Sequence, residues 1–423
     1  MSTRSVRVHH LSRVEGHGDI DIRVAGGKIE HAAWEVVETP RYFEVMLKGK
    51  HYSAAALLTS RICGICSIGH TLASLRATEN ALGVTVPPAA AALRLLAKHG
   101  ETLQSHYLHL FFLVAPDFLG LPSVLPLLKD DPELVDIARG LKGLGNKLSE
   151  LAAGRATHPV SLQVGGVTRM PEKHRLLEMK TDLERSLGWV EKTLDLFSTI
   201  QIPSFSRETE YVSLAGSDSY PWIGGDIVSS DGIRKGEPDY LDITNEYVTE
   251  SNTSKWTRLS RESYAVGALA RVNNNFELLP LKEQELARSL ALSPVCHNPF
   301  MNNVAQLIEC VNVTHDSIRL IEQLLDETDK QVMAEVKAGA GRGVGAVEVP
   351  RGILFHDYEY DDSGRIVKAN CVIPTTQNNA NIHFDLAALA GALLAGGADD
   401  DEIERVASML VRAYDPCISC SVH

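Results

Sequence analysis

The spacing of apolar residues divides the chain into a short strand region and a longer helical region. Apolar positions alternate or cluster over 6–8, 18–24 and 28–37, and Gly26-Gly27 lies between the last two segments. This pattern predicts N-terminal strands joined by a hairpin turn. Beyond these strands, apolar residues recur mostly with helical spacing, so the rest of the chain is predicted to be mainly helical.

Proline residues and N-cap signals delimit five long helices. Proline favours the first turn of a helix, and Asp131-Pro132 combines an N-cap residue with proline at the first helical position. The predicted helices extend from Pro87-Pro88 to about Pro116, from Asp131-Pro132 to before Thr157, from Pro171 to Pro203, and over about 300–328 and 384–412.

Helices of this length bury their apolar faces most easily by packing side by side as a bundle. The polar segment 204–260 is expected to be a surface excursion, and 340–383 returns to strand and loop character. We therefore expect an α+β, mainly α fold: a long helix bundle with small peripheral β-sheets near the N-terminus and in 340–383. Without internal repeats or low-complexity linkers, residues 1–423 are expected to form one large domain.

Charge and hydropathy narrow the function classes. The net charge of −13 and the lack of a basic run argue against nucleic acid as a partner. The chain shows neither the apolar core of a signal peptide nor a segment suited to span a membrane, so we expect a cytoplasmic protein. In a reducing compartment, its seven cysteines are expected to be buried residues, metal ligands or catalytic groups rather than disulfides.

Two C-x-x-C pairs near opposite ends of the sequence carry the candidate chemistry. Cys63 and Cys66 form the first, and Cys417 and Cys420 form the second. One such pair can be half of a zinc site, a redox dithiol or part of a cluster ligand set. The long separation of the pairs and the histidines near both weigh against a closed zinc site. The end of the sequence three residues after Cys420 suggests processing or assembly tied to the site.

The motifs around these pairs, R-x-C-G-x-C-x-x-x-H and D-P-C-x-x-C-x-x-H, resemble the two signatures of nickel–iron hydrogenase large subunits. The resemblance is closest to the cytoplasmic group, which includes sulfhydrogenase alpha subunits, NAD(P)-linked enzymes and heterodisulfide-reductase-linked enzymes. Further similar elements occur in the family's order at 13–17 (R-V-E-G-H), 40–44, 154–166, 270–273, 298–303, 349–352 and 373–376.

The resemblance implies a binuclear centre that cleaves H2 reversibly and heterolytically into protons and electrons. Cys63 and Cys417 would be terminal nickel ligands, whereas Cys66 and Cys420 would bridge nickel to an iron that carries one CO and two cyanides. Soft thiolate ligands suit both metals.

Other matched residues would surround this centre. Glu15 would hydrogen-bond to Cys417 and relay a proton, and Arg351 would lie over the open metal position. Outside the motifs, each would more often be an ordinary surface charge or ion pair. The resemblance also implies that His70 donates to a bridging sulfur, that Pro350 and Pro374 line the diatomic pocket, and that the Thr375 hydroxyl contacts a cyanide.

A second ion is implied near the C-terminus. Glu44, His423 and the backbone carbonyl of Cys371 would bind Mg²⁺ or Fe²⁺. In the family the chain is trimmed after this histidine once the metals are in place, so an end at His423 is expected of a matured protein. Cys296, Cys310 and Cys371 are expected to be buried and are not spaced for an iron–sulfur cluster.

Electron transfer therefore implies a small subunit that carries iron–sulfur clusters, with further diaphorase or electron-transfer subunits. The sequence does not identify the electron acceptor, because the glycine-rich run 341–345 lacks the strand–helix frame of a dinucleotide-binding fold. Gln377 departs from the family, which often has tryptophan there.

Three alternatives to a hydrogenase subunit that turns over H2 are a metal-free hydrogenase-like scaffold, a structural zinc protein and an H2 sensor. Retention of all four cysteines argues against the first.

Overall fold

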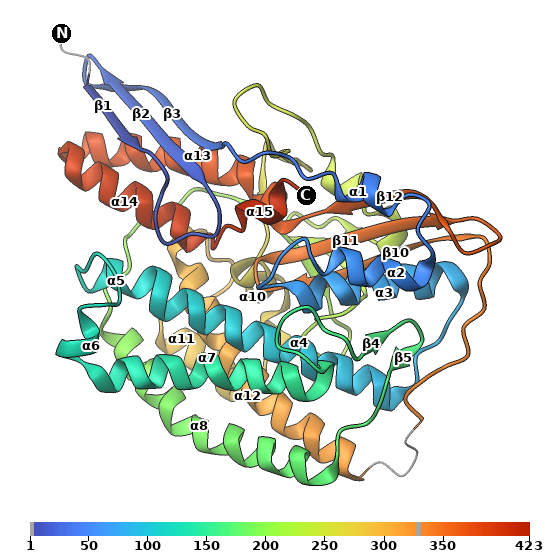
Figure 1. The fold of residues 1–423 in the computed structure, drawn as a ribbon. Coiled ribbons are helices and arrows are strands. Elements are labelled where there is room, and N and C mark those ends of the chain that lie inside the picture. Colours follow the sequence, from blue (N-terminus) through green and yellow to red (C-terminus); the bar gives the residue numbers. More distant parts are fainter. Residues whose placement is uncertain (1–3, 327–330) are drawn as a thin grey trace.

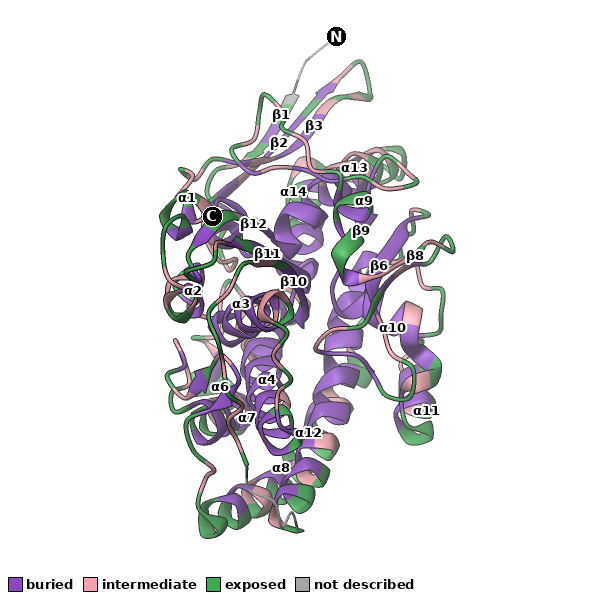
Figure 2. Cartoon of the chain, turned by 90° about the vertical axis from the view of Figure 1, so that its right-hand side faces the viewer, coloured by how far each residue is buried: buried purple, intermediate pink, exposed green. Residues whose placement is uncertain are grey.

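The computed structural model describes residues 4–326 and 331–423, and its lower half is a bundle of long helices (Figure 1). Helix α4 (Pro88–Leu108) packs against α7 (Pro132–Ala153) and α12 (Asn302–Asp326), and α8 (Lys173–Thr199) packs against α7 and α12. Figure 2 shows that α4 and α12 are buried along most of their length. The predicted bundle is confirmed, although residues 327–328 of one predicted helix lie outside the described residues.

The helix ends follow the predicted signals. The Asp131 side chain accepts a hydrogen bond from the Leu134 backbone N–H at 3.0 Å, and Gly154 ends α7 with a φ of 81°. At the end of α4 the chain continues into a π-helical turn, η1 (His109–Val114), and then into α5 (Ala115–Phe118). The sequence predicted this helix without its π-helical segment.

The N-terminal strands form the predicted sheet. Strands β1 (Arg4–Val8), β2 (Gly18–Ala25) and β3 (Lys28–Val36) pair antiparallel in that order, and Gly26-Gly27 turns the hairpin with φ angles of 61° and 75°. Strand β3 packs on helix α13 (Pro374–Ala395), so this sheet covers the C-terminal part of the chain (Figure 1).

A second antiparallel sheet contains β10 (Gly341–Val349), β11 (Gly352–Tyr360) and β12 (Ile366–Val372). The fold class is confirmed, but the peripheral position expected for this sheet is wrong. Most residues of β10 and β11 are buried, because α3 (Ser67–Leu82) lies directly across them. The sheet therefore belongs to the core next to the first cysteine pair, which immediately precedes α3.

Alternate glycines of β10 permit this close approach. A Cβ atom at Gly341, Gly343 or Gly345 would lie 2.2 Å from a backbone carbonyl oxygen of α3, at residues 81, 77 and 73 respectively. Two strand residues span about 6.6 Å and four helix residues about 6 Å, so the two repeats stay in step. We call these three residues the glycine stripe. They serve helix–strand packing.

The segment 204–260 is not merely the surface excursion that its composition suggested. Its strand β6 (Glu210–Ala215) is almost completely buried. It lies in a sheet of order β8-β7-β6-β9, formed with β7 (Asp226–Ser229), β8 (Arg234–Lys235) and β9 (Tyr264–Ala265). Apolar residues of β6 pack with those of β10 and β11 in one buried cluster, which explains their burial despite polar flanking sequence.

The helix predicted at 384–412 is wrong in its boundaries. Two helices occupy the region, α13 and α14 (Asp400–Ala413), and α13 begins ten residues earlier, at Pro374. Its first half is polar and rich in asparagine, which has low helical propensity, but buried side-chain hydrogen bonds to other segments favour the helix. Asn378, for example, accepts from the Val266 backbone N–H at 2.8 Å and donates to its carbonyl at 3.2 Å.

Shorter elements connect these layers. They are α1 (Phe43–Leu47), α2 (Tyr52–Thr59), α6 (Leu127–Asp130), β4 (Leu162–Gln163), β5 (Gly166–Val167), η2 (Glu237–Asp239), α9 (Leu241–Thr244), α10 (Ala268–Asn275), η3 (Phe276–Leu278), α11 (Leu281–Ser289), η4 (Pro299–Met301) and α15 (Ile418–Ser421).

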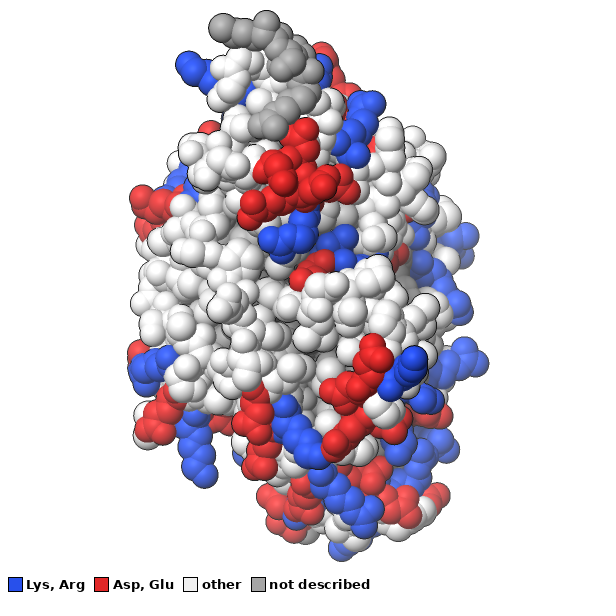
Figure 3. All heavy atoms as spheres, turned by 90° about the vertical axis from the view of Figure 1, so that its left-hand side faces the viewer, with Lys and Arg blue, Asp and Glu red and all other residues white. Residues whose placement is uncertain are grey.

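The surface at the α13–α14 end is uneven in charge (Figure 3). Acidic side chains gather where α14 begins, at Asp400, Asp401 and Glu402. Their negative charges interact favourably with the positive end of that helix dipole. Below them Figure 3 shows a broad area with few charged side chains. Leu125 and Leu128, in and just before α6, are among the exposed large apolar residues. Within the described residues, none of the helices has the length and apolar character required to cross a membrane.

The glycine stripe gives a stability prediction. Gly343→Ala should lower the free energy of unfolding by about 1–3 kcal/mol, because the added methyl group meets backbone atoms on α3 and forces the helix away. Thermal unfolding of the purified protein would measure this change. The control is Gly188→Ala on α8, where an added Cβ meets nothing within 4 Å and a helical alanine should stabilise slightly. Equal melting temperatures for both variants would contradict the packing role.

Candidate metal centre

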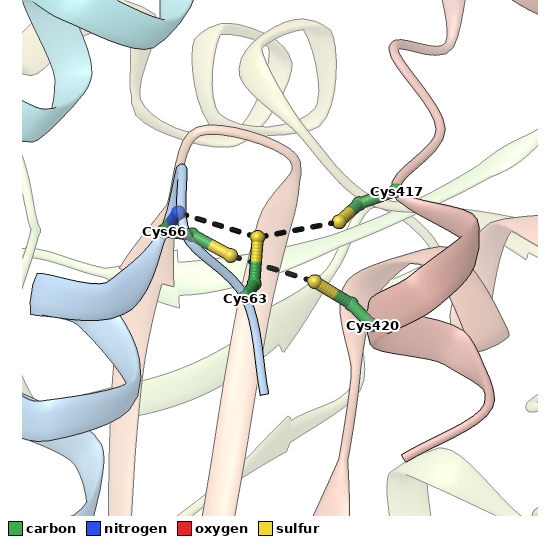
Figure 4. Close-up of side chains that lie close together, drawn as sticks. All are labelled: Cys63, Cys66, Cys417 and Cys420. Atoms are coloured by element: carbon green, nitrogen blue, oxygen red, sulfur yellow. Dashed lines mark hydrogen bonds between the residues drawn. The ribbon is translucent and has the colours of Figure 1, made fainter. Parts of the chain in front are cut away.

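The structure brings the two cysteine pairs together (Figure 4). Cys63 lies in the turn between α2 and α3, and Cys66 is the N-cap of α3. From the other end of the chain, Cys417 is the N-cap of α15 and Cys420 lies within it. All four side chains point inward, and their sulfur atoms lie within 4.8 Å of one another.

Sulfur atoms from opposite ends of the chain are paired across the cluster. Cys63 Sγ is 3.5 Å from Cys417 Sγ, and Cys66 Sγ is 3.6 Å from Cys420 Sγ. All four cysteines are buried and free. Four convergent soft donors, shielded from water, form a ligand set for a thiophilic metal centre.

The thiols differ in how readily they ionise. Burial raises the pKa of Cys417 and of Cys420 well above the usual range. The pKa of Cys63 is lowered, because hydrogen bonds from Cys417 and the other thiols favour its thiolate and Arg351 adds positive charge nearby. Without a cation, only part of this cluster ionises. Because a bound metal deprotonates the thiols that coordinate it, metal binding must release protons.

Arg351 provides fixed positive charge beside the thiols. It is buried, and its Nε and Nη2 donate to the Asp415 backbone carbonyl at 2.8 Å and to Asp415 Oδ1 at 2.9 Å. The third nitrogen, Nη1, finds no hydrogen-bond partner among the described residues. A buried donor without a partner costs free energy, and an anionic or diatomic group at the thiol cluster would satisfy it.

Thr375, Pro350 and Pro374 lie on segments adjoining the same centre. The Thr375 hydroxyl oxygen accepts from the Cys417 backbone N–H at 2.9 Å, so its own O–H is free to donate elsewhere. Pro374 begins α13, and the carbonyl of Pro350 accepts from Arg271 at 3.2 Å. These contacts fix the backbone of both proline segments.

Glu15 lies against the second cysteine pair but does not bond to a sulfur atom. Its backbone pairs with Cys417, and its carbonyl accepts from the Ile418 N–H at 3.0 Å. Its carboxylate accepts from the Ser419 backbone N–H at 3.0 Å and from the Ser419 hydroxyl. The expected neighbourhood of Glu15 is therefore present, with Ser419 as the direct partner in place of the Cys417 thiol.

His70 is buried, and burial lowers its pKa to about 4, so its ring is neutral near pH 7. Its Nδ1 lies 3.2 Å from His356 Nε2, and His356 Nδ1 lies 2.6 Å from the Tyr358 hydroxyl. The bonding partner that the structure gives His70 is thus a second histidine and not a bridging sulfur. The chain of polar groups fixes the ring's orientation.

Three ligand-type atoms converge near the C-terminus, as expected. His423 Nε2 is 2.9 Å from the Cys371 carbonyl oxygen and 3.2 Å from Glu44 Oε1. Burial acts to raise the pKa of Glu44, but hydrogen bonding and attraction from His423 outweigh it, and the net pKa is lowered. One nitrogen and two oxygen donors are a suitable set for a hard or borderline divalent cation.

Several groups around the centre escaped the sequence analysis. Arg41 joins the two cysteine loops by donating to the carbonyls of Ile62, at 2.7 Å, and Ser419. Asp415 is within the D-P-C motif, where its contact with Arg351 was not anticipated. Among the remaining cysteines, Cys310 and Cys371 are buried as expected, whereas Cys296 is only half-buried, which corrects that prediction.

Comparison with known proteins decides the family. A family model described as nickel-dependent hydrogenase matches residues 41–139 and 234–423, which include all four clustered cysteines. The chain belongs to the nickel-dependent hydrogenase family. The recognition made from the motifs is confirmed.

Individual relatives agree over nearly the whole chain. The alpha subunit of sulfhydrogenase 1 from Pyrococcus furiosus is 34% identical over 421 residues, covering 99% of this chain and 97% of that protein. The beta subunit of the NAD-reducing hydrogenase HoxS from Cupriavidus necator is 30% identical, with coverage of 100% and 95%. A crystal structure of an NAD⁺-reducing [NiFe]-hydrogenase in the H2-reduced state superposes with a TM-score of 0.89 at 29% identity, covering both chains fully.

This hydrogenase chain is therefore a catalytic large subunit, and the reaction of its family is the cleavage or formation of H2. Its nickel-dependent family and its four-cysteine cluster together make a metal centre part of the protein. The family match also excludes a purely structural zinc protein as the best description of the chain.

The cysteine cluster gives a metal-content prediction. In the purified hydrogenase, Cys420→Ser should remove most of the nickel, because a hydroxyl replaces a soft thiolate ligand. Elemental analysis would measure the loss. The matched control is Cys310→Ser, another buried cysteine, which lies on α12 outside the cluster and should leave the metal content unchanged. Full nickel content in Cys420→Ser would count against this ligand set.

Proposed function

We propose that this chain cleaves H2 reversibly at a nickel–iron centre held by the four clustered cysteines and passes electrons to an iron–sulfur subunit. The observation that carries the proposal is the convergence of four buried sulfur atoms within 4.8 Å in a nickel-dependent hydrogenase fold. The thiolates of Cys63, Cys66, Cys417 and Cys420 would together hold the nickel and the iron. When bound, the Fe(CO)(CN)₂–nickel unit supplies the open position and electron-accepting character that H2 cleavage requires.

The protein's own groups complete the site. The Nη1 donor of Arg351 has no hydrogen-bond partner among the described residues, and the guanidinium charge acts on the thiol cluster, where it would stabilise negative charge. The free O–H of Thr375 is suited to donate to a cyanide, and Pro350 and Pro374 supply walls without N–H groups. His70, held by His356, is placed to orient the bridging side of the cluster.

Glu15 is assigned as the first proton acceptor outside the cluster. Its carboxylate already accepts two hydrogen bonds from Ser419, between the two C-terminal cysteines, so a small rotation carries it toward the Cys417 sulfur. Its half-buried position links the enclosed cluster to the surface. Proton transfer requires such a group within hydrogen-bond reach of both sides.

A second ion is assigned to Glu44, His423 and the Cys371 carbonyl, with Mg²⁺ or Fe²⁺ as the occupant. Such an ion would tie α1 to β12 and to the residues that follow Cys420. The ion would hold the bridging cysteine in place without taking part in H2 chemistry.

The assignment of partners rests on the relatives. Both relatives are named as subunits, one of sulfhydrogenase 1 and the other of HoxS, which is named as an NAD-reducing hydrogenase. We infer a small iron–sulfur subunit, further diaphorase or electron-transfer subunits, and NAD(P) or another soluble molecule as final acceptor. We also infer one domain and a cytoplasmic location, with which the main hydrophobic cluster from Val6 to Val422 and the free cysteines agree.

Infrared spectroscopy with metal analysis tests the centre. The purified complex should show one band of metal-bound CO and two of metal-bound cyanide, with nickel and iron in this subunit near one to one. Absence of these bands, or zinc in place of nickel, would disprove the catalytic assignment. After infrared confirmation, H2 uptake with candidate acceptors identifies the electron partner.

The assignment of Glu15 gives a kinetic prediction. Glu15→Gln keeps the side-chain shape but cannot accept a proton, so turnover should fall by roughly 100-fold or more while the infrared bands stay unchanged. The matched control is Glu38→Gln. Glu38 accepts from the His17 backbone N–H at 2.9 Å in the same region and should tolerate the change in turnover assays. Wild-type turnover in Glu15→Gln would assign the proton to another group.

A further inference from the structure

Asp117 is shared by two arginines where the N-terminal loop meets the helix that leads to the second cysteine pair. Arg412 Nη1 donates to Asp117 Oδ1 at 2.9 Å and to Oδ2 at 3.0 Å, and Arg13 Nη2 donates to the same Oδ1. The exposed fractions of these side chains are 7% for Asp117, 6% for Arg412 and 15% for Arg13. We call these three residues the Asp117 clamp.

Each arginine has a second anchor. Arg13 Nη1 donates to the Leu113 carbonyl at 2.6 Å, in the π-helical turn that precedes Asp117. Arg412 Nε donates to the Ser12 carbonyl at 2.9 Å. The clamp therefore joins three elements that are distant in sequence: the loop that contains Ser12 and Arg13, the η1–α5 segment, and the last turn of α14.

The clamp and Glu15 join the same two segments, the loop 12–15 and the segment 412–419. Two residues beyond Arg13, the Glu15 carbonyl and carboxylate bond to residues 418 and 419. Along the other segment, Arg412 precedes these two residues by six and seven positions. The loop is thus fixed to the cysteine segment at two places, one on each side of Val14.

The paired guanidinium groups restrain the junction between the loop, η1–α5 and α14. A buried guanidinium must be paired, and its planar fork fixes the direction of its hydrogen bonds as a flexible ammonium would not. Arg13 also has a φ of 61°, which a side chain other than glycine adopts only where its surroundings hold it. Neutralising Asp117 would remove the charge that both arginines share and leave the Arg13 conformation with fewer restraints.

We propose that Asp117 is a positioning residue for Glu15: through Arg13 and Arg412, it sets the distance between the Glu15 carboxylate and the Cys417 segment. The inference rests on the proposed proton-accepting role of Glu15. Asp117 itself need not touch the metals or H2. Because proton transfer depends steeply on distance, a displacement of the loop by about 1 Å would slow turnover strongly.

A double-mutant cycle in the purified, metal-loaded hydrogenase complex tests this inference. H2 oxidation with a viologen dye is measured per nickel for wild type, Asp117→Asn, Glu15→Gln and the double variant. Asp117→Asn alone should slow turnover on the order of 10- to 100-fold. In the Glu15→Gln background it should cause less than about a twofold further loss, because the residue it positions is already inactive. Infrared bands and nickel content should stay those of wild type.

Glu79→Gln provides the matched control. Glu79 is also a buried carboxylate held by both terminal nitrogens of an arginine, Arg94, at 2.8 and 2.6 Å, but it does not contact the loop of Glu15. It should lower the melting temperature as Asp117→Asn does while leaving turnover per nickel unchanged. If Asp117→Asn does not fold, Arg13→Lys is put through the same cycle, because it keeps the charge and loses the second donor.

The outcomes separate the two levels of the argument. Independent, multiplicative losses in the double variant would overturn the positioning role, as would wild-type turnover in Asp117→Asn. Shifted infrared bands or lost nickel in that variant would also overturn it, by showing that the clamp supports the metal ligands directly. Wild-type turnover in Glu15→Gln would reject the role of Glu15 itself, and the inference with it.

Discussion

Everything in this hydrogenase depends on enclosing four thiol groups in a small volume away from water. Burial opposes their ionisation, so the cluster is suited to its ligand role only when a cation compensates for several thiolates at once. The surroundings are built for that condition. The buried Arg351 guanidinium interacts electrostatically with the thiols, and one of its donors has no hydrogen-bond partner among the described residues. Arg41 joins the two cysteine loops by donating to a carbonyl of each.

The fold supplies this enclosure from two directions. Helix α3 begins directly after its N-cap, Cys66, and the glycine stripe lets it pack closely on β10, which fixes the first cysteine pair against the central sheet. The second pair follows α14 and is held by α13 through Thr375 and by the N-terminal loop through Glu15. Neither half of the site is complete alone, and the helix bundle contacts both: Gln104 donates to the Ile65 carbonyl and Gln306 to the Asp415 carboxylate.

Sequence patterns revealed whatever depends on local signals. Prolines and the Asp131 cap located the long helices, and the two C-x-x-C motifs located the centre. Local sequence patterns do not predict polar contacts between residues that are far apart in the chain. The Thr-Gln-Asn run at the start of α13 has poor helical propensity and becomes helical because its side chains bond to distant backbone groups. Likewise, nothing in R-V-E-G-H indicates that Arg13 meets Asp117, which lies 104 residues away.

The paired sulfur atoms are separated by 354 positions along the chain, which gives the metal centre a role in polymer terms. Bound metals act as a reversible cross-link that closes a loop nearly as long as the protein. For a covalent link of this span, the chain-entropy model gives about 6 kcal/mol of stabilisation, because closure entropy rises with the logarithm of loop length. Closure places residues from near both ends of the chain beside each other, as the native topology does. Metal binding by both cysteine pairs therefore indicates that the two ends of the subunit have reached their native positions.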